Sequence, residues 1–233
     1  MRTAVLISGG LDSAVLLAEE AARRGPGDSD DTAFVQPIYV SVGLAWEAAE
    51  LAALRALLAV EPLVGRTRPL VSLSVDMRDV YRANHWAIEG KPPRYHTPDE
   101  DVYLPGRNVI LLGKAGVFCA AARIDRLVLG TLAHNPFPDA TPAFRTAMAK
   151  ALSLGLAHPL TIDAPFADAR KAEVIRRGAA LGVPLHVTLS CMDSKEMIHC
   201  GTCSKCRERH DAFVEAGIVD ETDYVDRSHV GTV

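Results

Sequence analysis

Residues 8–13 read Ser8-Gly9-Gly10-Leu11-Asp12-Ser13, and they follow the apolar run Ala4-Val5-Leu6-Ile7 without a break. A buried strand that ends in two glycines and then opens a helix is typical of a phosphate site. The glycines let the backbone approach an anion closely, and the free N–H groups of the helix start point at it. The two serines add hydroxyl donors, and the aspartate can hold Mg²⁺ against phosphates. The Gly-Lys-Ser/Thr ending of the kinase P-loop is missing, so the stretch predicts a nucleotide site of another kind, with an ordinary glycine-rich turn as the alternative.

The totals describe an ordinary soluble globular chain. Its 233 residues suit one domain, or one domain with a small appendage. The net charge of −4 argues against a protein that works mainly by binding nucleic-acid backbone, which requires a basic face. No apolar run approaches the roughly 18–20 residues of a membrane helix, and no signal peptide precedes the first strand. We therefore expect a cytoplasmic protein without a membrane or nucleic-acid partner.

Short apolar runs alternate with longer periodic segments along most of the chain. We expect strands at 4–7, 34–42, 70–75, 126–132 and 159–164, and helices at 12–24, 46–58, 109–122, 141–154 and 169–181. This alternation predicts an α/β fold with a doubly wound parallel sheet. Residues 82–103 interrupt the pattern with a long irregular excursion, in which His85, Trp86, Arg94 and His96 either close over a substrate or form a mobile surface loop.

Four of the five cysteines lie close together near the C-terminus, and they are Cys191, Cys200, Cys203 and Cys206. A Cys-x2-Cys turn brings two thiolates to neighbouring corners of a tetrahedral Zn²⁺ site, and four thiols suit a closed structural site. An iron–sulfur cluster, free thiols, a nucleic-acid-binding zinc knuckle, or His199 or His210 in place of one cysteine are the alternatives. Cys119 stands alone in an apolar helix, where it is expected to pack as a small hydrophobic residue.

Together these motifs resemble the 7-cyano-7-deazaguanine synthase (QueC) family over most of the chain. Residues 8–13 are similar to the SGGxDS loop of the ATP pyrophosphatase (PP-loop) superfamily, whose members cut ATP between its α and β phosphates. Further similar segments are Tyr103 to Leu112, Pro138-Asp139, Lys171 to Ile175, the cysteine cluster with His199 and Arg209, and Ala212 to Gly217.

The resemblance implies a reaction and a set of binding residues. ATP would activate the carboxylate of a 7-carboxy-7-deazaguanine, ammonia would give an amide, and a second adenylation would give the nitrile. The residues implied for the ATP phosphates and Mg²⁺ are Ser8, Gly9, Gly10, Leu11, Asp12 and Ser13. Lys171 and Arg107 would stabilise the transferring phosphate, unless they are a solvated helix-start lysine and a surface pair. Asn108 would orient the nucleotide or substrate.

The resemblance also implies a cofactor set and a domain division. ATP and Mg²⁺ would bind the domain at 1–186, and Zn²⁺ would bind a C-terminal subdomain at 187–233 through the four clustered cysteines. Relatives in the family suggest a homodimer.

The sequence departs from the family around the acceptor. Where the family has Y-G-Q-x-H and a glutamate, the chain runs from Tyr39 to Trp46 and Glu47, and the cysteine and arginine that usually follow Asp139 are missing. We expect Trp46, Glu47 and Asp139 near the substrate, with Trp46 either stacking on a heteroaromatic ring or packing in the core. The same departures leave open another carboxylate acceptor, an amide product, a tRNA-modifying adenylating enzyme, or a non-catalytic zinc module.

Overall fold

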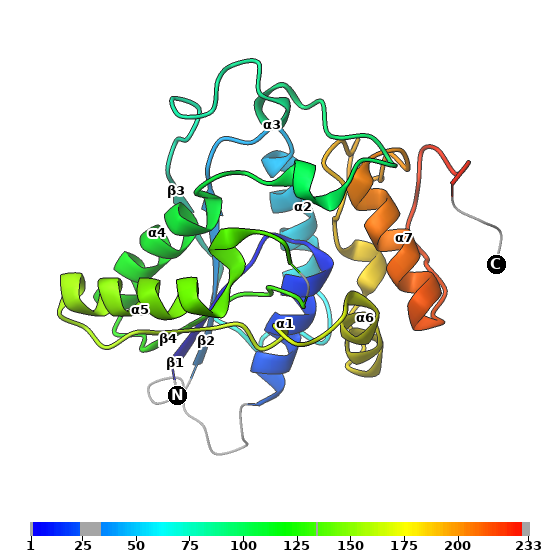
Figure 1. Ribbon diagram of the computed structural model, residues 1–233. Helices are drawn as coiled ribbons and strands as arrows, with labels where there is room; N and C mark the ends of the chain where they lie inside the picture. Colours follow the sequence, from blue (N-terminus) through cyan, green and yellow to red (C-terminus); the bar gives the residue numbers. More distant parts are fainter. Residues whose placement is uncertain (1, 24–33, 134, 230–233) are drawn as a thin grey trace.

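A five-stranded parallel sheet forms the centre of the molecule in the computed structural model (Figure 1). The structure describes residues 2–23, 34–133 and 135–229. The strands are β1 (Arg2–Leu6), β2 (Phe34–Ser41), β3 (Val71–Ser74), β4 (Arg126–Val128) and β5 (Thr161–Asp163), in the spatial order β3-β2-β1-β4-β5. This arrangement confirms the predicted α/β fold with a parallel sheet.

Helices cover both faces of this sheet (Figure 1). They are α1 (Leu11–Ala22), α2 (Glu47–Leu58), α3 (Trp86–Glu89), α4 (Arg107–Ala121), α5 (Pro142–Leu156), α6 (Lys171–Ala180) and α7 (Ser204–Ala216), with short 3₁₀ turns η1 (Asp99–Val102), η2 (Pro138–Ala140) and η3 (Leu185–Val187). Successive strand residues point to opposite faces. Val5 packs with α1, α2 and α6, whereas Ala4 packs on the side of α4. Both neighbours are buried, which explains why the strand is an unbroken apolar run.

The strand order places a crevice beside β1. From β1 the chain proceeds outward to β2 and β3, and it then returns to the other side of β1 to form β4 and β5. The carboxyl ends of β1 and β4 therefore meet where the winding direction reverses, which is the usual ligand position in an open α/β sheet. Residues 8–13 follow β1 at this point.

Two elements differ from the sequence-based expectation. β4 ends at Val128 rather than at residue 132, and the chain then passes Gly130, where a Cβ would lie 3.3 Å from the carbonyl carbon of Asp12. α7 was not predicted, because charged and polar residues dominate it and its buried side includes Ser204 and Arg209. The expected end of the first helix at residue 24 lies outside the described residues.

The excursion at 82–103 packs against the C-terminal part of the chain. The N–H of Ser204 donates to the carbonyl of Pro93 at 3.0 Å, and Arg207 donates to the carbonyls of Tyr95 (2.8 Å) and Thr97 (2.9 Å). In Figure 1 this segment runs from α3 across the top of the molecule to α7. The excursion thus connects the start of α4 with the cysteine-bearing part of the chain through these hydrogen bonds.

Arg209 ties the C-terminal segments together from inside. Its side chain is fully buried, and it donates to the carbonyl of Leu185, to the hydroxyl and carbonyl of Thr188, and to the hydroxyl of Thr222. Because a buried charge is tolerated only when its donors are used, this set of bonds fixes how the segment after η3 lies. No helix in the described ranges combines the length and the apolar character needed to cross a bilayer.

Candidate functional site

The loop after β1 has the geometry of a phosphate cradle. Gly9 has φ +76°, and a Cβ there would lie 2.7 Å from the carbonyl oxygen of Glu50, so only glycine fits without a shift. The hydroxyl of Ser8 accepts from the N–H of Gly10 (3.4 Å), and the hydroxyl of Ser13 accepts from the N–H of Ser8 (3.3 Å). Gly10 is the N-cap of α1 without a side-chain cap. The first N–H groups of this helix are therefore directed at the crevice.

A chain of four charged side chains lies next to this loop. Lys171 begins α6, and its Nζ lies 3.3 Å from a carboxylate oxygen of Asp12 and 2.6 Å from Glu208. Lys205 donates to the other oxygen of Glu208 at 2.6 Å. The two carboxylates raise the pKa of Lys171 against the effect of burial, and Lys171 and Lys205 lower the pKa of Glu208. Burial raises the pKa of Asp12. Asp12 and Lys171 were predicted as site residues. Glu208 and Lys205 were not, because they lie on α7, which was not predicted.

Asp12 also presents a free oxygen. Its Oδ1 is buried and has no hydrogen-bond partner among the described residues. An unpaired carboxylate oxygen next to a phosphate loop suits a hard divalent cation such as Mg²⁺.

The opposite wall of the crevice is the start of α4. Arg107 is the first residue of α4, and its Nε is buried without a hydrogen-bond partner within the described ranges. Asn108 is held in place by Asp139, whose carboxylate accepts its N–H at 3.1 Å and whose carbonyl accepts its Nδ2 at 3.1 Å. Burial raises the pKa of Asp139. Arg107 is thus a partly buried cation with one buried donor that no described residue uses.

Glu50 lies between the two walls and was not singled out in the sequence. It accepts from the hydroxyl of Tyr39 at 2.9 Å and from the indole N–H of Trp46 at 3.1 Å. Burial raises its pKa to about 7, although Arg107 acts in the opposite direction. Burial likewise raises the pKa of Tyr39. The sequence did hold a signal for Glu50, because it follows Trp46 by four residues and so lies on the same side of the helix.

The three expected acceptor residues are placed differently from one another. Trp46 contacts Glu50 and stacks on Trp86 with ring centroids 5.7 Å apart. Glu47 is occupied by its own loop, where its carboxylate accepts from the N–H groups of Val42 (2.7 Å) and Gly43 (3.1 Å). Glu47 lies outside the lining of the two cavities described below, whereas Asp139 and Trp46 line them.

Two adjoining cavities occupy the crevice, with volumes of ≈ 270 Å³ and ≈ 460 Å³. Together they are within the size range of small-molecule sites. The residues that line both are Ser8, Gly10, Asp12, Glu50, Arg107, Gly130, Asn135 and Phe137. The smaller one continues to Tyr103 and Asp139, and the larger one continues to Lys171 and Lys205. Tyr103 and Phe137 stack with centroids 5.0 Å apart and give the smaller cavity an aromatic wall.

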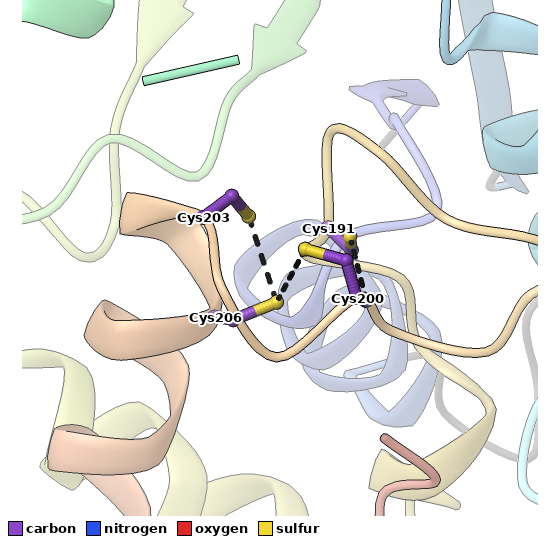
Figure 2. Close-up of side chains that lie close together, drawn as sticks. All are labelled: Cys191, Cys200, Cys203 and Cys206. Atoms are coloured by element: carbon purple, nitrogen blue, oxygen red, sulfur yellow. Dashed lines mark hydrogen bonds between the residues drawn. The ribbon is translucent and has the colours of Figure 1, made fainter. Parts of the chain in front are cut away.

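The four cysteines converge on one point (Figure 2). Their sulfurs lie within 4.8 Å of one another, with 3.8 Å between Cys200 and Cys206 and 3.5 Å between Cys203 and Cys206. Zn–S bonds near 2.3 Å give a tetrahedron with edges of about 3.8 Å. The N–H groups of Asp193 and Cys200 donate to the sulfur of Cys191, both at 3.3 Å, as suits a thiolate. The cluster therefore fits a single tetrahedral Zn²⁺ ion.

Histidine does not take part in this cluster within the described residues. The Nε2 of His199 accepts the N–H of Ser190 at 3.1 Å, and burial lowers the pKa of His199 to about 3. Cys119 is fully buried on α4 in the hydrophobic core, as expected, and burial raises its pKa to about 12. A thiol in that state does not suit the sulfur-carrying role that a tRNA thiolase requires.

The sheet order and the glycine loop at its reversal point place the chain in the class of doubly wound α/β proteins with a ligand crevice at the carboxyl ends of the strands. Residues 84–217 match the family model described as queuosine biosynthesis protein QueC. The 7-cyano-7-deazaguanine synthase of Methanothrix thermoacetophila is 33% identical over 236 residues, which cover 96% of this chain and 98% of the relative. The protein of the same name from an Azoarcus species is 33% identical over 232 residues, with 96% of each chain covered.

The chain therefore belongs to the QueC family of 7-cyano-7-deazaguanine synthases. Among solved structures, the tRNA thiolase NcsA from Methanococcus maripaludis, with its 4Fe–4S cluster, is 14% identical with a TM-score of 0.45, over 100% of this chain and 78% of that one.

Proposed function

We propose that this protein is an ATP-dependent 7-cyano-7-deazaguanine synthase whose two half-sites are the adjoining cavities of the crevice. The supporting observation is the arrangement of one phosphate loop between two partly buried cations, Lys171 on one side and Arg107 on the other. A carboxylate-activating enzyme has to hold a polyphosphate and an acid in line, and this arrangement supplies positive charge on both sides of the transferring phosphate.

ATP would place its polyphosphate on the loop. The uncapped N–H groups of α1, with Ser8 and Ser13, would bind the phosphate oxygens, and Lys171 would neutralise the charge on the departing pyrophosphate. Arg107 lines both cavities with an unpartnered Nε and would stabilise the transferring group from the other wall. Asn108, fixed by Asp139, would orient the nucleotide or the acceptor.

The reaction would need no protein nucleophile. A carboxylate oxygen of the acceptor attacks the α-phosphorus of ATP, and pyrophosphate leaves. Ammonia attacks the acyl carbon, and AMP leaves to give the amide. The amide oxygen then attacks the α-phosphorus of a second ATP and pyrophosphate leaves, and loss of AMP from carbon together with two protons from nitrogen gives the nitrile. The protein accelerates these steps by holding the groups in line and by stabilising negative charge as it develops.

The smaller cavity is the proposed acceptor site. Tyr103 and Phe137 offer a flat apolar wall to a heteroaromatic ring, and Glu50 and Asp139 lie on the polar side. The family's Gln and His are missing here, and Glu50, which accepts from Tyr39 and Trp46, lies in this region instead. This chain would therefore recognise the ring with its own set of groups. An amide end product, or a related acid as acceptor, is the alternative to be tested.

Two metal ions belong to the proposal. Asp12, through its free oxygen, is the residue that would hold Mg²⁺, which supplies charge neutralisation at the phosphates. The four cysteines would hold Zn²⁺, which here supplies folding energy rather than chemistry.

We also propose the division into an ATP domain at 1–186 and a zinc-binding subdomain at 187–233, and a homodimeric assembly. Apolar side chains on the outer side of α4 and α5 support the assembly, since Val117 is 53% exposed and Leu154 is 73% exposed. Light scattering coupled to size-exclusion chromatography at micromolar concentration tests it, and a monomer mass there would contradict it.

The activity is tested by release of AMP and pyrophosphate with ammonia and a series of deazapurine acids. We expect turnover with 7-carboxy-7-deazaguanine, two AMP per product, and a nitrile identified by mass spectrometry. Turnover confined to another acid would refute the substrate, and one AMP per product would indicate that the reaction ends at the amide. Turnover without AMP release would refute the adenylation mechanism.

A further inference from the structure

The helix that begins at the cysteine cluster reaches the phosphate loop. Cys203 is the N-cap of α7 and Cys206 lies in its first turn, so the cluster fixes the start of this helix. Two residues beyond Cys206, Glu208 contacts Lys171, which in turn contacts Asp12 of the loop. Lys205 and Glu208 both line the larger cavity together with the loop.

Glu208 is the member of this group that bonds to both lysines. One of its oxygens accepts from Lys171 and the other accepts from Lys205, each at 2.6 Å. Its side chain is 24% exposed and that of Lys205 is 29% exposed, so neither is a freely solvated surface charge. A carboxylate held by two ammonium groups at such short distances fixes the position of both.

Glu208 also sets the position of the Lys171 ammonium group. Lys171 lies 2.6 Å from Glu208 but 3.3 Å from Asp12, so its shorter bond is to α7 and not to the loop. Without Glu208, Asp12 would be the remaining acidic partner of Lys171 in this chain of contacts. The lysine would then move onto the carboxylate of Asp12, whose Oδ1 has no other partner among the described residues, and away from the position from which it can bind a phosphate.

We propose that Glu208 is a positioning residue that holds Lys171 and Lys205 beside the phosphate loop, and that Lys205 is a further pyrophosphate-binding cation. The helix that starts at the cysteine cluster is thereby one wall of the ATP site. The inference rests on the proposed function in one respect, namely that the bound ligand is ATP.

The experiment measures binding of inorganic pyrophosphate and of AMP by calorimetry, in the absence of any acceptor acid. The lysines would face the β and γ phosphates. We therefore expect Glu208→Gln and Lys205→Ala each to weaken pyrophosphate binding about tenfold, and to change AMP binding less than twofold. Asp211→Asn is the matched control, because it removes one negative charge from an exposed position of the same helix, and it should bind both probes as the unmodified protein does.

A double variant distinguishes positioning from independent binding. If Glu208 acts by holding Lys205, the Glu208→Gln, Lys205→Ala protein should bind pyrophosphate only slightly less well than Glu208→Gln alone. In turnover, we expect kcat to fall about tenfold or more in Glu208→Gln with the KM for the acid within twofold. Metal content and circular dichroism of each variant establish that the fold and the cysteine cluster are intact.

Unchanged pyrophosphate affinity in both single variants would overturn the proposal, and so would equal loss of AMP binding. If Glu208→Gln fails to fold, Lys205→Ala decides the question with the same probe. Failure of the proposed function has a different signature, in which no deazapurine acid is turned over while the effect on pyrophosphate binding persists.

Discussion

Replacing Gly9 by alanine should damage the phosphate loop far more than the loss of a glycine does elsewhere. The new Cβ would lie 2.7 Å from the carbonyl oxygen of Glu50, and φ is +76°. Gly65 is the matched control, because its φ is +71° and a Cβ there meets nothing within 4 Å. Both variants carry the left-handed backbone strain of about 1–2 kcal/mol, offset by about 0.4–1 kcal/mol because alanine lowers the entropy of the unfolded chain.

The clash is the part that only Gly9→Ala has. Forcing an extra carbon into a close-packed position costs about 1–3 kcal/mol. For a chain of this size, a difference of about 2 kcal/mol corresponds to about 4–8 °C in Tm. We therefore expect thermal unfolding of Gly9→Ala to begin well below that of Gly65→Ala. ATP binding should weaken in the first variant alone, since the loop has to move away from Glu50.

The assay is a melting curve with and without ATP, followed by calorimetric titration with ATP. Equal Tm values for the two variants would refute the reasoning, because they would mean that the backbone of α2 yields to the added methyl group without cost. Equal ATP affinities would refute the assignment of this loop to the phosphates.

Three further predictions follow from the charges and the sulfur cluster. Burial holds the pKa of Glu50 at about 7 against an unfolded value of 4.5, so the stability from its protonated form is present below pH 4.5 and is lost as the pH rises to 7. Unfolding titrations should show Glu50→Gln gaining about 3 kcal/mol on the unmodified protein across that interval, and a constant difference would contradict the buried acid. Lys171→Met should lower kcat for AMP release about 100-fold while the acid still binds, and full activity would exclude its role. Metal analysis should find one zinc per chain, and chelation should lower Tm and expose four thiols to a thiol reagent; iron, or no metal, would contradict the site.

Sequence patterns were sufficient for the parts of the molecule that depend on local chemistry. The glycines of the loop, the apolar strands and the cysteine spacing each carry a physical requirement within a few residues, and the structure places them as expected. The same holds for Arg107 and Lys171, which begin α4 and α6 at the edges of one crevice. Their roles in binding ATP stay predictions until the variants are measured.

The residues that sequence reasoning missed depend on long-range contacts. Glu208 and Lys205 lie on a helix in which charged residues obscure the apolar periodicity. They are linked to Asp12 only through Lys171, and that contact depends on how α7 packs against α6 in the folded protein. Glu47 was expected near the acceptor because of its position after β2. In the structure both of its carboxylate oxygens accept hydrogen bonds from the turn at 41–43. Glu50, one turn later, points into the crevice instead.

The order of the strands separates two tasks that one crevice performs. In the proposed function, the loop after β1 and the start of α6 carry the charges that face ATP, whereas the segment after β4 and the start of α4 supply much of the wall of the proposed acceptor cavity. Substitutions in those outer segments can change which acid is accepted while the shared activation chemistry is left untouched. Under the proposed function, the start of α4 and the segment after β4 are therefore the places where the choice of acid can change while the charges beside the phosphate loop stay in position.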